Sequence, residues 1–262
     1  MKGLRRFFTG LVDRRIVLQT DLMPITQFSD MDIFLAGYPK SGNTWFQNLI
    51  TGIHFGVDPE LAPDTLIQEL VPDIHFKKYY RRFKTPMFFK THNLPRPEYK
   101  RVIYLVRDGR DVMVSYYHHQ MAIMNEKIDF MAMVRDGKGL FPGKWHKHVQ
   151  AWAANPYNAE KIIIKYENLK QDPLTVLTQF CEFAQIERDQ TFLQHVIDQT
   201  EFAKLQAKER ADHMFFANEV WPKNQKFFRR GSVGSYKDEM PPDVLEIFLR
   251  DANPMLKEMG YV

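Results

Sequence analysis

The residues from Tyr38 to Thr44 bring a lysine, a glycine and several polar side chains together between an apolar strand pattern and a helical pattern. A loop in that position directs backbone N–H groups and the positive end of a helix dipole at one spot, and Lys40 adds a full charge. Gly42 has no Cβ, so the backbone can approach an anion closely there. The sequence therefore predicts a phosphate-binding loop with contacts from Lys40, Ser41, Gly42, Asn43 and Thr44.

The order of residues in this loop differs from that of an ATP-binding P-loop. The ATP-binding form reads G-x-x-x-x-G-K-[ST], with the lysine directly after the second glycine. Here Lys40 precedes Gly42, and Asn43 occupies the usual lysine position. The apolar run 101–107 ends in Arg107, where an ATP-using enzyme is expected to carry a metal-holding acid. The pattern indicates a phosphate ester bound without a metal ion.

The elements that position this loop read as an alternation of buried strands and helices. Near-continuous apolar runs predict strands at 32–37, 87–90, 101–107 and 161–167, and helical patterns lie at 44–55, 109–121, 173–185, 188–208 and 241–259. Residues 211–236 have no clean period and suit a loop that closes over a ligand. We expect an α/β fold, a single domain over 1–262, with a central, mostly parallel sheet flanked by helices.

Composition narrows the class of protein further. The net charge of +4 is too small to indicate a nucleic-acid binder. The single cysteine, Cys181, excludes an internal disulfide and has the spacing of helix core. No apolar run approaches the roughly 20 residues of a membrane span, which favours a cytoplasmic location. The basic, amphipathic start of the chain, residues 1–19, is expected to form a surface helix or a frayed terminus.

Three motifs carry a resemblance to a known family. YPKSGNTW at 38–45, FFKTHNLP at 88–95 and RVIYLVRDGRDVMVSYYHH at 101–119 resemble the cytosolic sulfotransferases, whose common forms include YPKSGTTW and KTHLP. Further similar segments extend the resemblance over about residues 32–237. The departures are Asn43 in place of a threonine, an extra Asn93, and GSYK at 234–237 where the family has GDWK. The family's dimer motif is not visible, so the oligomeric state stays open.

The resemblance implies a role for each matching residue. The co-substrate is 3'-phosphoadenosine-5'-phosphosulfate, and no metal is needed. His92 corresponds to the catalytic base, and Lys40 and Lys90 assist the transferred group. Contacts to the nucleotide are implied for Trp45 and Phe202, which would sandwich the adenine, for Tyr166 and Thr200, and, around the 3'-phosphate, for Arg107, Ser115, Arg229, Arg230 and Gly231.

The sequence therefore predicts in-line transfer of a sulfuryl group to the hydroxyl of a small or mid-sized acceptor. A nucleotide kinase and a non-catalytic nucleotide-binding protein are the alternatives. Aromatic residues in segments expected to border the site favour an apolar or aromatic acceptor; they are Tyr79, Tyr80, Phe83, Phe141, Phe215, Phe216 and Trp221. His118 and His119 are expected in surface or core packing more than at the acceptor, and His146 and His148 on a helix surface.

Overall fold

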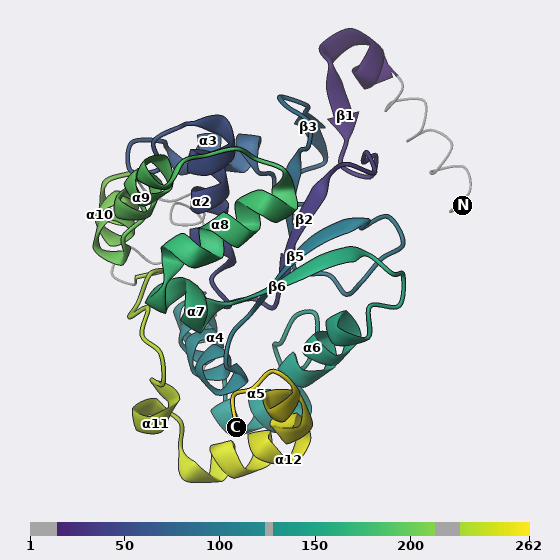
Figure 1. The fold of residues 1–262 in the computed structure, drawn as a ribbon. Helices are drawn as coiled ribbons and strands as arrows, with labels where there is room; N and C mark the ends of the chain where they lie inside the picture. The colour runs from purple at the N-terminus through teal and green to yellow at the C-terminus, as the bar shows by residue number, and fades with distance from the viewer. Residues whose placement is uncertain (1–14, 124–127, 213–225) are drawn as a thin grey trace, which may run out of the picture.

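A four-stranded parallel sheet in the order β4-β2-β5-β6 forms the centre of the molecule (Figure 1). The computed structural model describes residues 15–123, 128–212 and 226–262. The strands are β2 (Ile33–Gly37), β4 (Phe88–Thr91), β5 (Arg101–Val106) and β6 (Glu160–Lys165). The predicted α/β class with a parallel sheet and flanking helices is confirmed.

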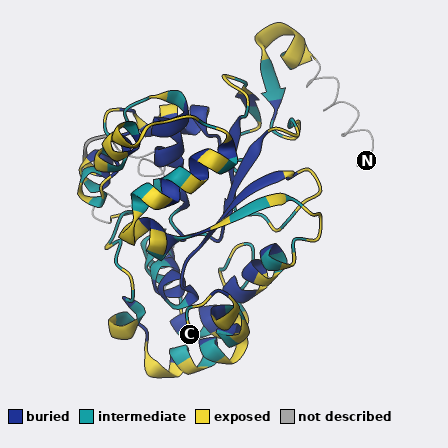
Figure 2. Cartoon of the chain, viewed as in Figure 1, coloured by how far each residue is buried: buried dark blue, intermediate teal, exposed yellow. Residues whose placement is uncertain are grey.

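The apolar strands are buried on both faces because side chains alternate across a strand. In β2, Ile33 and Leu35 face one layer of helices, and Phe34 and Ala36 face the other. All four are fully buried. The dark blue of β2 and β5 in Figure 2 shows this central position, whereas β6 at the sheet edge is partly exposed.

Helices cover the two faces of the sheet. On the Leu35 face lie α2 (Asn43–Phe55), α8 (Pro173–Ala184) and α9 (Gln190–Gln199). On the Phe34 face lie α4 (Gly109–Ile123), α5 (Phe130–Asp136), α6 (Trp145–Ala154) and α12 (Pro242–Glu258). The other labelled helices are α3 (Asp64–Leu70), α7 (Tyr166–Gln171), α10 (Phe202–Asp212) and α11 (Tyr236–Glu239). Residues 15–20 are also helical.

The structure corrects two predicted boundaries. The single helix expected over 188–208 is two helices, α9 and α10, because Thr200 ends α9 with a non-helical backbone and donates its hydroxyl to the Val196 carbonyl at 3.0 Å. The strand expected to run to residue 167 ends at Lys165, and α7 begins at Tyr166. At both corrected boundaries a predicted site residue stands at the end of a helix: Thr200 follows α9, and Tyr166 begins α7.

A second, two-stranded sheet was not predicted. β1 (Leu22–Pro24) pairs antiparallel with β3 (Tyr79–Arg81). Arg82 follows β3 and donates two hydrogen bonds to the buried carboxylate of Asp32, at 2.8 and 2.7 Å. This bidentate pair fixes the small sheet beside the start of β2.

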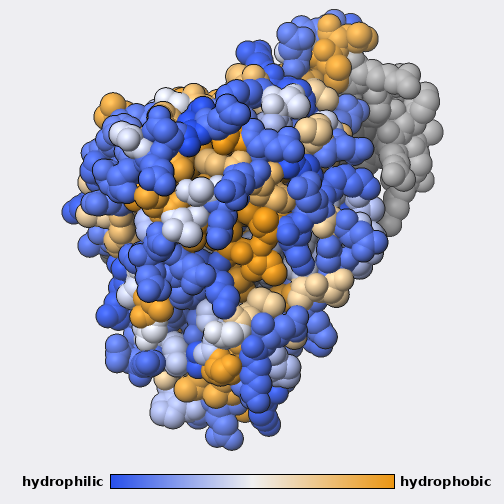
Figure 3. Space-filling model, viewed as in Figure 1, coloured by the Kyte–Doolittle hydropathy of each residue, from blue (hydrophilic) through white to orange (hydrophobic). Residues whose placement is uncertain are grey.

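Figure 3 shows a mostly hydrophilic face with hydrophobic residues gathered near its middle. Among the described residues, no helix is both long and apolar enough to span a membrane. Most of the predicted N-terminal helix, residues 1–14, and residues 213–225 of the predicted closing loop lie outside the described residues.

Candidate active site

A cavity of about 600 Å³ opens where the carboxyl ends of the parallel strands meet. Ligands bind at this edge in open α/β sheets. All the predicted site residues except Ser41 line this cavity; they are Lys40, Gly42, Asn43, Thr44, Trp45, Lys90, His92, Arg107, Ser115, Tyr166, Thr200, Phe202, Arg229, Arg230 and Gly231. The fold thus brings together residues that are scattered over most of the sequence.

The phosphate loop connects β2 to the N-terminus of α2. Lys40 and Gly42 both have positive φ, 71° and 97°, which folds the backbone tightly before the helix begins. The Asn43 amide donates to the Tyr38 carbonyl at 2.9 Å and closes the loop. The first helical hydrogen bond runs from Phe46 N to Gly42 O at 3.0 Å. The N–H groups of residues 43–45 therefore have no acceptor within the helix and can face an anion.

Ser41 differs from its neighbours in the loop. Its side chain is buried, with 1% of its surface exposed, and its hydroxyl has no hydrogen-bond partner among the described residues. It does not line the cavity. The predicted contact of Ser41 with a nucleotide therefore rests on its place in the loop and stays a prediction.

Tyr166 packs directly against the phosphate loop. A Cβ at Gly42 would lie 2.8 Å from Tyr166 Cδ2, so only glycine fits there. The ring of Trp45 stands edge-on to the Tyr166 ring at 5.8 Å, and Tyr166 Oη donates to the Gly231 carbonyl at 3.1 Å. Tyr166 thereby connects the phosphate loop to the segment that carries Gly231.

Arg107 sits directly after β5 and faces the cavity while nearly all of its surface is buried. Its guanidinium donates to the carbonyls of Lys40 at 3.2 Å and Ser232 at 2.9 Å, and it lies 4.5 Å from the centre of the Tyr166 ring. The Nε atom is buried and has no acceptor among the described residues. A nitrogen of the same guanidinium also lies 3.8 Å from a carboxylate oxygen of the buried Asp111, so Arg107 has an acidic neighbour on α4.

The ammonium of Lys40 lies 4.1 Å above the centre of the Phe227 ring. Burial, together with the charges of Arg107 and Lys90, lowers the pKa of Lys40 to about 7. A phosphate beside Lys40 would supply the missing negative charge and favour its protonated form.

His92 follows β4 with its ring held in one orientation. Its Nδ1 lies 2.8 Å from the carbonyl oxygen of Gly37. A carbonyl oxygen can only accept, so Nδ1 carries the proton and Nε2 is the basic nitrogen. Burial and the charge of Lys90 lower the pKa of His92 to about 4, which keeps the ring neutral at neutral pH. A neutral imidazole with a fixed tautomer can act as a general base.

Lys90 and His92 stand two residues apart, which puts both side chains on the same side of the chain. Lys90 is 4% exposed, and its ammonium lies 3.2 Å from a carboxylate oxygen of the fully buried Asp73. The sequence analysis missed Asp73 because its partner is 17 residues away and no local spacing reveals the pair.

Arg229 and Arg230 share one carboxylate. Glu239 of α11 accepts two hydrogen bonds from Arg229, at 2.6 and 3.0 Å, and one from Arg230 at 2.8 Å. The Nε2 atom of His118 lies 2.9 Å from the same carboxylate. Burial alone would raise the pKa of Glu239. The hydrogen bonds and the charge of Arg229 have the larger, opposite effect and hold this pKa at about 2. His118 thus takes part in side-chain packing beside the site, as expected.

Two buried acids anchor the segment that carries these arginines. Glu209 of α10 accepts the backbone N–H groups of Phe227 and Phe228. Asp111 of α4 accepts those of Gly234 at 2.7 Å and Tyr236 at 2.9 Å. The described part of the predicted closing loop is therefore fixed at both ends.

The aromatic residues predicted to contact the nucleotide lie in the cavity wall together with Gly231. Gly231 has a positive φ of 59°, and a Cβ there would lie 2.5 Å from the Phe202 ring. The ammonium of Lys170 lies 5.6 Å from the centre of that ring. Trp45 has a buried indole nitrogen without an acceptor among the described residues. These aromatic groups offer flat surfaces for a planar base.

The structure corrects several predictions about the aromatic residues expected to border the site. Of these residues, Phe141 lines the cavity, whereas Tyr79 and Tyr80 do not, because their strand β3 pairs with β1; Phe83 does not line it either. Phe215, Phe216 and Trp221 lie outside the described residues. The sequence analysis missed other apolar and aromatic residues of the wall, namely Phe76, Tyr116, Ile123, Leu205, Phe227 and Phe228.

The histidines predicted on the surface of α6 are buried instead. His146 is 9% exposed and His148 is 1% exposed, and His148 Nδ1 lies 3.0 Å from Tyr104 Oη. The spacing of Trp145, His148 and Trp152 follows the buried face of a helix and was the missed signal. His119, which was expected in packing more than at the acceptor, instead lines the cavity, and burial, with the charge of Lys40, lowers its pKa to about 3.

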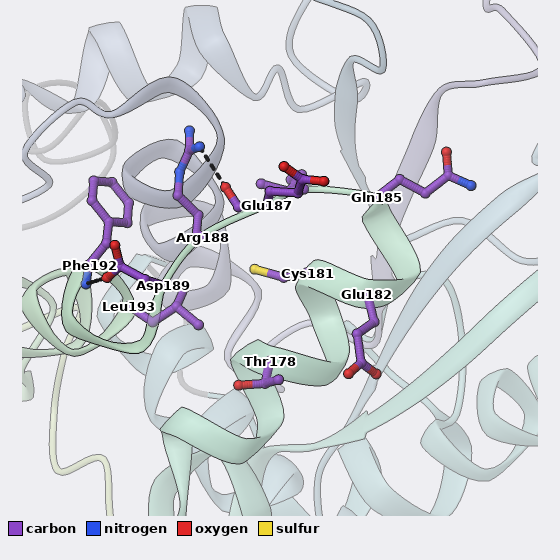
Figure 4. A pocket seen from close by; sticks show the side chains of 10 residues that line it. Thr178, Cys181, Glu182, Gln185, Glu187, Arg188, Asp189, Phe192 and Leu193 are labelled. Atoms are coloured by element: carbon purple, nitrogen blue, oxygen red, sulfur yellow. Dashed lines mark hydrogen bonds between the residues drawn. The ribbon is translucent and has the colours of Figure 1, made fainter.

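A second hollow lies between α8 and the segment that leads into α9 (Figure 4). The Arg188 guanidinium lies 5.0 Å from the centre of the Phe192 ring and donates to the Ile53 carbonyl at 2.9 Å. Burial raises the pKa of Cys181 to about 11, so its thiol is protonated at neutral pH. Cys181 is buried in α8, and the prediction that it is helix core is confirmed.

The described residues hold no group of three or more histidine, cysteine or acidic side chains arranged to bind a metal ion.

Comparison with known proteins identifies the family: the chain matches the sulfotransferase domain family over residues 30–260 and belongs to it. It is 25% identical over 270 residues to mouse Sulfotransferase 1E1, covering 95% of this chain and 91% of that protein. It is 26% identical to luciferin sulfotransferase of Photinus pyralis, covering 84% of this chain and 70% of that protein. The prediction of an enzyme of the class that uses 3'-phosphoadenosine-5'-phosphosulfate is thereby confirmed.

Solved structures share the fold. Retinol dehydratase, in a complex with androsterone and the inactive cofactor PAP, superposes with a TM-score of 0.67 at 19% identity, over 88% of this chain and 82% of that one. Mouse sulfotransferase SULT7A1, complexed with PAP, has a TM-score of 0.66 at 22% identity, over 90% and 91% of the two chains.

Proposed function

We propose that this sulfotransferase moves the sulfuryl group of 3'-phosphoadenosine-5'-phosphosulfate to the hydroxyl of an apolar acceptor, with His92 as the base. The observation that carries the proposal is the orientation of His92, whose Nδ1 lies 2.8 Å from the Gly37 carbonyl oxygen. Nε2 is then the nitrogen that can take a proton, and Lys40 and Lys90 line the same cavity. A base beside two cations suits the transfer of an anionic group.

The cavity wall fits the two phosphate positions of the nucleotide. The phosphate loop, with Lys40, would hold the 5'-phosphosulfate through backbone N–H groups at the start of α2. Arg107 and Ser115 would hold the 3'-phosphate, and both line the cavity. The position of Arg107 supports this assignment, since it lines the cavity directly after β5 and its guanidinium can donate to a phosphate oxygen.

The adenosine would lie along the aromatic part of the wall. Trp45 and Phe202 would sandwich the adenine, and Tyr166 and Thr200 would contact the nucleotide. The Thr200 hydroxyl already donates to the Val196 carbonyl, so it is left to accept from a ligand. Arg229, Arg230 and Gly231 would close on the 3'-phosphate, where the phosphate would compete with Glu239 for both arginines.

The chemical step is a direct in-line transfer. His92 Nε2 takes the proton of the acceptor hydroxyl while the acceptor oxygen bonds to sulfur, and the bond from sulfur to the 5'-phosphate oxygen breaks. Lys40 and Lys90 stabilise the negative charge that builds on the leaving phosphate and on the flat sulfuryl group. The products are a sulfate ester and 3'-phosphoadenosine-5'-phosphate.

The acceptor is expected to be apolar. Phe141, Tyr116 and Ile123 line the cavity together with His92. The related structures of retinol dehydratase contain androsterone or retinol, each of which carries one hydroxyl on an apolar skeleton. A cytoplasmic location and a single domain over residues 1–262 stay predictions.

Incubation with the ³⁵S-labelled donor and a panel of androsterone, retinol and 4-nitrophenol tests the transfer directly. We expect a labelled product with at least one acceptor and undiminished turnover in EDTA. In a parallel melting experiment, 3'-phosphoadenosine-5'-phosphate should raise Tm much more than AMP, because Arg107, Ser115 and Arg230 need the 3'-phosphate. Equal shifts would contradict the nucleotide assignment. Activity that strictly needs ATP and a divalent metal would favour a nucleotide kinase. Binding of the nucleotide without any sulfuryl transfer would favour a non-catalytic nucleotide-binding protein.

A further inference from the structure

The segment from Pro72 to His75 lies against the edge strand β4 at the residue that carries a proposed catalytic side chain. The Lys90 N–H donates to the Pro72 carbonyl at 2.9 Å, and the Ile74 N–H donates to the Lys90 carbonyl at 3.1 Å. Asp73 and Lys90 thereby form a parallel bridge at the open edge of the sheet. The N–H and the carbonyl of Lys90 are therefore both engaged by this segment, while β2 pairs with β4 on its inner side.

The side chain of Asp73 holds the other end of Lys90. Asp73 is fully buried, and one carboxylate oxygen lies 3.2 Å from the Lys90 ammonium. The other oxygen accepts the backbone N–H of His75 at 2.9 Å. Burial alone would raise the pKa of Asp73, but the charge of Lys90 and the hydrogen bond from the His75 N–H help to lower that pKa, so the carboxylate is ionised. Lys90 is thus held at its backbone and at its ammonium by the same segment.

The side chain of His75 contacts His92, the proposed base. The His75 Nε2 accepts the backbone N–H of His92 at 3.0 Å. The two imidazole rings stack with their centres 5.7 Å apart and their planes 14° from parallel. Phe141 packs edge-on against the His75 ring, with the two ring centres 5.3 Å apart. Burial lowers the pKa of His75, which favours the neutral ring that can accept this hydrogen bond.

We propose that Asp73 and His75 are positioning residues for sulfuryl transfer, Asp73 by holding the Lys90 ammonium and His75 by holding the backbone and ring of His92. The proposal rests on the proposed function, because it acts through Lys90 and His92. Neither residue needs to touch the nucleotide or the acceptor for this role. A displacement of a catalytic group by about 1 Å can cost up to about a hundredfold in rate, so the supporting contacts decide the turnover.

Two substitutions of similar size separate a hydrogen-bonding role of His75 from a space-filling one. In His75→Gln the side-chain oxygen can accept the His92 N–H, whereas in His75→Leu no acceptor remains. We expect His75→Gln to keep at least about half of the wild-type kcat and His75→Leu to lose about tenfold or more. The Kd for 3'-phosphoadenosine-5'-phosphate should change less than about twofold in both. Equal kcat values in the two variants would overturn the assignment of His75.

Asp73→Asn tests whether Asp73 positions Lys90, and Glu69→Gln is the matched control. Glu69 pairs with Lys77 at the surface of the same region, so its substitution makes the same chemical change away from the cavity. Asp73→Asn should lower kcat about tenfold or more while the control keeps it. Wild-type kcat in Asp73→Asn would overturn its role. If that variant does not fold, Asp73→Glu, which keeps the carboxylate but moves it by one methylene, tests the same role: kcat should fall about tenfold, and wild-type kcat would overturn it.

The assay uses the panel acceptor that the wild type converts fastest. If the wild type transfers no label to any panel member, the proposed function fails, and the positioning roles fail with it. If the wild type is active and the His75 variants are indistinguishable, the positioning role of His75 alone fails.

Discussion

The guanidinium of Arg229 donates two hydrogen bonds to the carboxylate of Glu239, at 2.6 and 3.0 Å. Glu239 therefore stands where a ligand phosphate would have to compete for the arginine. Arg230 donates to the same carboxylate, so one acid engages two of the residues proposed to bind the 3'-phosphate.

Replacing Glu239 by Gln should strengthen the binding of 3'-phosphoadenosine-5'-phosphate, because the two guanidinium groups lose a competing anion. We expect Kd to fall by about tenfold, in the range of a charge-assisted pair at a partly exposed site. Calorimetric titration with 3'-phosphoadenosine-5'-phosphate measures the Kd of the variant and of the wild type. Asp238→Asn, on the neighbouring residue of α11, is the control of equal charge. Equal effects of the two substitutions would contradict the competition.

The binding of 3'-phosphoadenosine-5'-phosphate should weaken as the pH rises above 7. Burial, with Arg107 and Lys90, lowers the pKa of Lys40 to about 7, so above that pH the free protein must take up a proton to pair with the phosphate. The Kd should then rise by up to about tenfold for each pH unit. In Lys40→Arg the charge persists and this part of the pH dependence should disappear. The same slope in the variant would show that another group is responsible.

His148 should make the protein sensitive to acid. Burial, and then the charge of His92, lower the pKa of His148 to about 3 from its usual 6.5. Below pH 6.5 the unfolded chain binds a proton that the folded chain does not, so stability falls as the pH falls. The slope is about 1.4 kcal/mol per pH unit for each such histidine, or about 2 kcal/mol between pH 6.5 and 5.

Denaturant unfolding of His148→Gln at pH 7 and pH 5 checks this expectation. The variant should lose about 2 kcal/mol less than the wild type over that interval. His195→Gln, at an exposed position of α9, serves as the control and should follow the wild type. An unchanged acid loss in His148→Gln would show that the protonation of other groups causes it.

The phosphate loop and the sheet could be predicted from the sequence because their signals are local. The strand before Gly37, the turn through Gly42 and the helix that follows are contiguous, and apolar runs mark β2 and β5. Arg107 and His92 each follow a predicted strand. Because the carboxyl ends of parallel strands lie at the same edge of the sheet, both residues could be predicted to lie at that edge.

The contacts that tune the site could not be predicted, because they join residues far apart in the chain. Asp73 pairs with Lys90 through a single isolated β-bridge at the outer edge of β4. One bridged residue leaves no periodic pattern in the sequence. Three-residue strands such as β3 carry too little pattern to detect, so Tyr80 was assigned to the acceptor side and lies in the core. His148 was missed although its spacing from Trp145 follows the buried face of α6.

The most direct test of the account is the turnover of His92→Ala, measured with the ³⁵S donor beside its affinity for 3'-phosphoadenosine-5'-phosphate. If His92 is the base, kcat should fall by about 10² or more, while Kd stays nearly unchanged because the imidazole faces the acceptor. Lys40→Ala should weaken both binding and turnover. If His92→Ala keeps more than about a third of the wild-type kcat, a loss too small for a missing base, then His92 is structural and the proposed mechanism is wrong.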